Sequence, residues 1–185
     1  MIYTKDDRIE GLVEGEMMLY RVRRHWFGLM IVYVEVGIGF AAAALLLYFL
    51  APIMYPNADI ARRNFNLSIL ISVAAITTWL ILVLYTYIYR QSMLIITNKN
   101  LTQIIQRGLF SRKVSELSMA NVEDVTADQH GFFATTFNYG TLQVETAGEA
   151  DNFDFVLCPN PNFYGKIVLD ARQKYVDAHP GNARR

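Results

Sequence analysis

Two long apolar segments dominate the first half of the chain. Residues 27–55 read FGLMIVYVEVGIGFAAAALLLYFLAPIMY with a single charged side chain, Glu35, and residues 65–89 read FNLSILISVAAITTWLILVLYTYIY with none. About 20 apolar residues in a helix cross the hydrocarbon core of a bilayer, so each segment is long enough to span it. The pattern predicts a transmembrane hairpin over residues 26–90, with helices at about 27–54 and 65–89 and a short polar turn between them.

After Arg90 the pattern changes to short stretches of strand-forming residues separated by turn residues. These stretches are 92–97, 101–107, 113–117, 122–127, 141–146 and 153–157. Such regular spacing predicts a meander that forms a sandwich or a partly open barrel. The aromatic segment 132–137 is either a short helical turn or a continuation of the preceding strand. Because at most two residues separate the second apolar segment from the first strand, we expect the sheet to lie close to the bilayer.

The last predicted element is a helix with one apolar stripe. Asn160 is a candidate N-cap and Pro161 occupies the first helical position. Phe163, Ile167, Ala171 and Tyr175 then recur every four residues, the spacing of a helix that packs on a sheet. We therefore expect a segment 1–25, the hairpin 26–90, a β-rich domain 91–178 and a flexible tail 179–185.

Hydrophobic residues make up 53% of the chain and charged residues only 18%. The 17 basic side chains are balanced by 17 acidic ones, which argues against a nucleic-acid-binding protein.

The basic residues near the helix ends give the hairpin an orientation. Near the helix ends, the side that carries both termini has six basic residues and the connector has two, Arg62 and Arg63. The six are Arg21, Arg23, Arg24, Arg90, Lys99 and Arg107. Positive charge favours the cytoplasmic side, so both termini are predicted to be cytoplasmic.

Glu35 is the one ionisable side chain inside either apolar segment. Such groups are costly in a membrane and are treated first as functional candidates. A hydrogen-bonded or protonated carboxyl, with Thr77, Thr78 or Tyr85 of the second helix as partners at similar depth, is one interpretation. A site in an ion path or an oligomer contact is the other.

No pattern in the sequence indicates catalysis, a cofactor or a metal. The three histidines, His25, His130 and His179, are dispersed and lack metal-ligand spacing. The single cysteine, Cys158, excludes an intramolecular disulfide and is interpreted as a small buried residue on a strand. We expect a protein that is not an enzyme and binds no cofactor or metal.

Several short motifs, in this order along the chain, resemble the bacterial pleckstrin-homology-like (PH-like) domain family that follows paired membrane helices. They are Ile96 to Leu101 (ITNKNL), Gly108 to Phe110 (GLF), Leu117 to Val125 (LSMANVEDV), Tyr139 to Leu142 (YGTL), Thr146 to Gly148 (TAG) and Asn160-Pro161. The segment from Gly15-Glu16 to His25-Trp26 is similar to the family's entry into its first membrane helix. The resemblance implies an antiparallel barrel or sandwich of six or seven strands closed by a C-terminal helix.

Three functions follow from the resemblance and the residues together. The leading one is a non-enzymatic adaptor of the bacterial plasma membrane that binds a protein partner or a second copy of itself. The alternatives are an accessory subunit of a transporter or channel that uses Glu35, and a module that binds lipid headgroups. The candidate headgroup contacts are Lys99, Arg107, Arg112 and Lys113. The bilayer and a protein partner or homo-oligomer are the expected partners, and nucleic acid is not.

Overall fold

The computed structural model of the protein describes residues 16–57, 59–146 and 152–179. The chain forms two units. Residues 26–90 make up the helical unit, and residues 1–25 with 91–185 make up the β unit. The helical unit therefore lies, in the sequence, between two parts of the β unit. The predicted flexible tail lies outside the described residues except for His179, as do residues 1–15 of the N-terminal segment.

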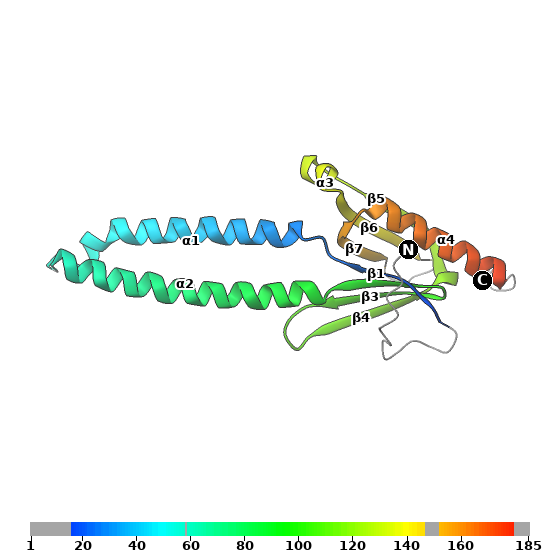
Figure 1. Ribbon diagram of the computed structural model, residues 1–185, viewed down its shortest axis with the longest axis horizontal. Coiled ribbons are helices and arrows are strands. Elements are labelled where there is room, and N and C mark those ends of the chain that lie inside the picture. The colour runs from blue at the N-terminus through cyan, green and yellow to red at the C-terminus, as the bar shows by residue number, and fades with distance from the viewer. Residues whose placement is uncertain (1–15, 58, 147–151, 180–185) are drawn as a thin grey trace. The chain divides into compact units, whose positions relative to one another are not determined.

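The helical unit consists of α1 (Phe27–Met54) and α2 (Ile60–Gln91), which run side by side (Figure 1). Both are long and apolar enough to cross a membrane. Helix α2 begins five residues earlier than expected, because residues 60–64, which were predicted to belong to the connector, are also helical. Tyr33 of α1 and Thr86 of α2 share a hydrogen bond between their hydroxyl groups.

Two antiparallel sheets form the β unit. The first has the order β1-β2-β3-β4 and the second β5-β6-β7. Their bounds are β1 Met18–Arg23, β2 Met93–Thr97, β3 Asn100–Gln106, β4 Arg112–Ser118, β5 Val122–Asp128, β6 Tyr139–Thr146 and β7 Phe153–Pro159. A 3-10 turn, η1 (Met119–Asn121), joins the sheets, and the short helix α3 (Phe132–Thr136) precedes β6.

The core of the β unit lies between the two sheets and helix α4 (Pro161–Ala178). Leu94, Ile96 and Leu101 from the first sheet are buried with Leu142 and Phe155 from the second. Val168 and Ala171 close the core from α4, and Ile167 and Tyr175 pack against it. The predicted apolar stripe is thus confirmed from Ile167 onward, whereas its first residue, Phe163, is 43% exposed. This arrangement confirms the antiparallel strands and the C-terminal helix of the predicted fold. In the described residues the ladders of the two sheets do not join, so the unit is not a closed barrel.

Three local features differ from the sequence predictions or decide between them. Strand β1 was not predicted, although it pairs with β2 from Met18↔Thr97 to Arg23↔Met93. Asn160 precedes α4 in a left-handed conformation (φ 43°, ψ 60°), and its side chain does not cap the helix. The aromatic segment near Phe132 forms the short helical turn, α3, rather than a continued strand.

Candidate functional site

Glu35 lies on the exposed surface of α1. It has no hydrogen-bond partner among the described residues, so the predicted contact with Thr77, Thr78 or Tyr85 does not form within this chain. Thr77 instead donates its hydroxyl proton to the carbonyl of Val73 in its own helix, at 2.9 Å. A carboxylate on an apolar, exposed helix face remains a functional candidate.

The four cations proposed for lipid headgroups do not form one cluster. Arg107, Arg112 and Lys113 lie at or beside the turn between β3 and β4, and all three are exposed. Lys99 lies in the turn between β2 and β3, at the other end of β3. Because β3 is seven residues long, its two ends are about 20 Å apart. Lys99 therefore belongs to a different surface of the β unit from the other three.

A groove with a volume of about 510 Å³ lies between β1, the β2–β3 turn and α4. Strand β1 and the residue before it contribute Met17, Leu19 and Tyr20, and the turn contributes Asn98 and Lys99. Helix α4 and the residue after it contribute Ile167, Asp170, Ala171, Lys174, Tyr175, Ala178 and His179. Volumes of this order are typical of sites that bind a ligand or peptide side chains.

The wall from β1 arises from an irregular strand. The register shifts between Met18 and Tyr20, so Leu19 is an extra residue that is not paired with β2. Leu19 and Tyr20 are consecutive and both are exposed, each to 39%. Tyr20 also contacts α4, with its ring edge-on to those of Phe163 and Tyr164, each at 5.9 Å between centroids.

Charged groups line the rim of this apolar groove. Asp170 and Lys174 are exposed on α4, one turn apart, and Lys99 lies on the opposite side. At the end of the helix, the His179 ring stacks on Tyr175 at 4.7 Å, and its Nδ1 lies 3.1 Å from the Tyr175 carbonyl oxygen. The groove thus combines an apolar floor with two lysines and one carboxylate.

Sequence reasoning missed the part of the groove that β1 supplies. In the segment MLYRVR, apolar Tyr20 and Val22 alternate with charged Arg21 and Arg23, which is the period of a strand. The structure buries Val22 and leaves Arg21 and Arg23 more exposed. This alternation could have predicted strand β1. No local pattern, however, shows that β1 pairs with a strand on the far side of the helical hairpin.

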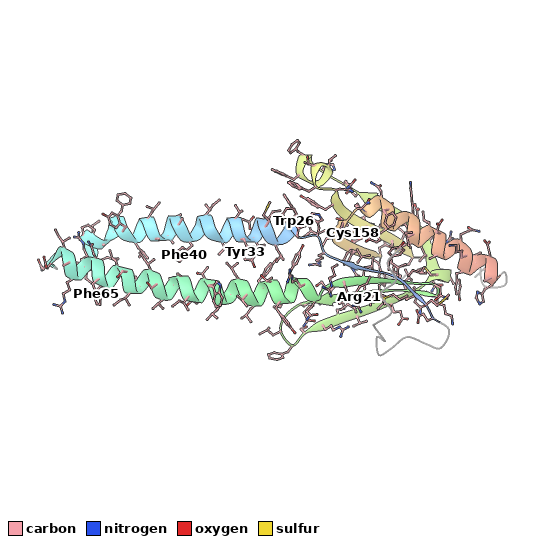
Figure 2. All side chains as sticks on the ribbon, in the orientation of Figure 1. Arg21, Trp26, Tyr33, Phe40, Phe65 and Cys158 are labelled. Atoms are coloured by element: carbon pink, nitrogen blue, oxygen red, sulfur yellow. The ribbon has the colours of Figure 1, made fainter. Side chains whose placement is uncertain are left out.

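The segment that follows β1 contacts the second sheet. The His25 backbone N–H donates to the Leu157 carbonyl at 2.7 Å, and the His25 ring stacks on Tyr139 at 5.4 Å. Burial lowers the pKa of His25. Cys158 of β7, which is labelled in Figure 2, is fully buried. Burial raises the pKa of its thiol to about 12. The pKa of Tyr164 is raised by burial and then by Cys158 and Tyr20.

Within the described ranges 16–57, 59–146 and 152–179, no group of three or more His, Cys, Asp or Glu side chains could hold a metal ion. The buried thiol of Cys158 is a poor nucleophile, because only the thiolate attacks and its pKa lies far above neutrality. The expectation that the protein is not an enzyme stays a prediction.

The sequence of residues 28–171 matches the model of the bacterial PH domain family. The chain belongs to the bacterial PH domain family. The matched range begins in α1 and ends in α4, so it includes both apolar helices as well as strands β2 to β7. Strand β1 lies before that range. The searches of curated proteins and of solved structures gave no match.

Proposed function

We propose that this bacterial PH domain protein is a non-enzymatic adaptor of the plasma membrane, with α1 and α2 spanning the bilayer and both termini in the cytoplasm. The length and hydropathy of the two helices support the span. The excess of basic residues on the side of the termini supports the orientation. The groove between β1 and α4 is the observation that carries the adaptor role.

The groove favours a protein segment as its ligand. Its lining residues Leu19, Ile167 and Tyr175 offer apolar surface of the kind that anchors apolar side chains of a partner. Lys174 is exposed on its rim, so an acidic residue that flanks the apolar ones would be attracted to the ammonium group of Lys174. The proposed partner is an amphipathic segment, from another protein or a second copy of the chain, with apolar anchors and carboxylates beside them.

Site-directed photocrosslinking in intact cells tests this role. A photoreactive amino acid in place of Leu19, within the groove, should crosslink to a protein segment of the proposed composition. The same amino acid at Val156 is the matched control, since Val156 is 41% exposed on β7 and outside the groove. Equal crosslinking at the two positions would contradict the adaptor role.

Reversal of one charge adds specificity to the test. Lys174→Glu on the rim should reduce crosslinking at Leu19 by roughly fivefold, the effect of one unfavourable charge near an acidic partner. Lys166→Glu makes the same change on an exposed position of α4 outside the groove, and it should leave the yield unchanged. Mapping of the crosslinked peptide shows whether the partner is a different protein or a second copy of the chain.

Glu35 supports a second candidate function, that of an accessory subunit in a transporter or channel-like oligomer. Its carboxyl is exposed on an apolar helix and has no hydrogen-bond partner among the described residues. A contact with another membrane-embedded protein would remove this group from lipid.

A further inference from the structure

The β unit has one end at which β1 finishes and β2 starts, which we name the junction end. The register pairs Arg23 with Met93 and Met93 with Ile104, and it pairs Gln106 with Arg112. Because neighbouring strands are antiparallel, the turn between β3 and β4, residues 107–111, also lies at the junction end. The β2–β3 turn and η1 lie at the opposite end.

The second sheet places α3 at the same end. His25, two residues after β1, donates its backbone N–H to Leu157 of β7 and stacks on Tyr139, the first residue of β6. Helix α3 ends at Thr136, just before Tyr139. Figure 1 shows α3 and the β3–β4 turn at one end of the β unit, away from the C-terminal end of α4.

Both connections expose large apolar side chains. In the β3–β4 turn, Leu109 is 44% and Phe110 101% exposed, and in α3, Phe132 is 78% and Phe133 56% exposed. These four side chains extend from two separate connections and give the junction end exposed apolar surface, the kind of surface at which proteins meet a partner or a membrane.

The backbone beneath these side chains is held in place. Gln106 donates its side-chain N–H groups to the carbonyls of Gly108 (2.7 Å) and Leu109 (3.4 Å), which closes the β3–β4 turn. In α3, Ala134 is buried, and the Thr135 hydroxyl donates to the Gly131 carbonyl at 3.1 Å. The four exposed apolar side chains therefore extend from backbone segments that hydrogen bonds and burial hold in place.

The charges at the junction end are mostly positive. Arg23, Arg107, Arg112 and Lys113 are exposed there, and Asp128 at the end of β5 is the only carboxylate at this end in the described part of the chain. Cations at the same end of a domain as exposed aromatic and aliphatic side chains are typical of a surface that meets anionic lipid headgroups.

We propose that the junction end lies on the anionic face of the bilayer, with Leu109, Phe110, Phe132 and Phe133 in its interfacial layer. This inference rests on the proposed membrane span of α1 and α2. Only residues 24–26 separate β1 from α1, and only Ser92 separates α2 from β2. Three residues reach about 10 Å, so the chain itself keeps this end near the membrane surface. The occupant of the apolar surface is then lipid.

Fluorescence from the full chain in nanodiscs tests the contact. The environment-sensitive dye NBD is attached to Phe110→Cys or Phe133→Cys, and to Asn121→Cys at the opposite end as control. Cys158 can stay, because it is buried and its thiol is protonated at neutral pH. In nanodiscs with about one third anionic lipid, we expect the NBD emission at positions 110 and 133 to be blue-shifted. Lipids with a shallow doxyl label should quench this emission at least about twofold. Neither effect is expected at position 121.

A fourth labelled position separates this proposal from the one on which it rests. Ile76→Cys lies within α2 and is quenched by deep doxyl labels only if that helix spans the bilayer. Quenching at 76 with water-like emission at 110 and 133 would overturn the lipid contact and leave the span intact. Loss of quenching at 76 as well would overturn both. A blue shift at 110 without lipid quenching would indicate a protein contact and also overturn the proposal.

Charge reversal tests the role of the cations. Lys113→Glu should reduce the shallow quenching at position 110 by about fivefold in anionic nanodiscs and leave it unchanged in neutral ones. Lys166→Glu, an exposed position on α4, is the matched control and should have no effect. Equal effects of the two variants would overturn the electrostatic part of the proposal.

Discussion

Gly140 in β6 packs directly against the backbone carbonyl of Asp128, the last residue of β5. A Cβ atom at Gly140 would lie 2.2 Å from that oxygen and 2.9 Å from Cγ of Gln129. No side chain fits at such a distance unless the backbone moves. The glycine of the YGTL motif is therefore required by the close approach of two strands next to α3.

We expect Gly140→Ala to destabilise the β unit by roughly 3 kcal/mol, because the added methyl group forces β5 and β6 apart. Cys158, paired with Gly140 in β7, supplies the measurement: its alkylation by a maleimide in increasing urea reports opening of the sheet. Gly108→Ala is the control, since a Cβ there meets nothing within 4 Å. Equal urea midpoints for both variants would contradict the packing argument.

We expect the Cys158 thiol to make the free energy of unfolding of the β unit depend on pH in the alkaline range. Its pKa is about 12 in the folded chain against an ordinary value of 9.0, so the folded state keeps the proton that the unfolded state loses. Stability is then full below pH 9 and falls as the pH rises toward 12. Cys158→Ala should remove this part of the decline. Urea midpoints of both proteins between pH 8 and 11 provide the measurement, and parallel curves would refute the prediction.

The hydrogen bond between Tyr33 and Thr86 holds α1 to α2. Thr86 donates its own proton to the Leu82 carbonyl at 2.7 Å, so the Tyr33 hydroxyl is the donor between the helices. Tyr33→Phe should weaken the hairpin by about 0.6 kcal/mol, a common value for such bonds between membrane helices. Titration with SDS, followed by the fluorescence of the two tryptophans, Trp26 and Trp79, measures this change. Tyr48→Phe on the exposed face of α1 is the control.

Glu35→Gln tests the second candidate function. If the carboxyl contacts another membrane protein or lines an ion path, the variant should shift the oligomer distribution toward monomer and abolish ion flux in liposomes. Asp59→Asn, a matched change outside both helices, should leave the two measurements unaltered. Wild-type assembly and flux in Glu35→Gln would remove the functional interpretation of this residue.

The sequence determined most of the elements, because their signals are local. A long apolar run gives each membrane-length helix, and the period of two gives most strands, such as the alternating buried Leu142 and Val144 of β6. The four-residue spacing from Ile167 to Tyr175 gives α4 and its buried face. Each signal depends only on neighbours a few residues apart, so it can be recognised without knowledge of the fold.

Only the tertiary structure decided which elements meet. Strand β1 pairs with β2 across the whole helical hairpin, and this pairing makes Leu19 and Tyr20 one wall of the groove. Strand direction sends Lys99 to one end of the β unit and Arg107 to the other, although the sequence places them close together. Pairing over long sequence separations depends on the combined burial of several strands and α4, and no local pattern records it.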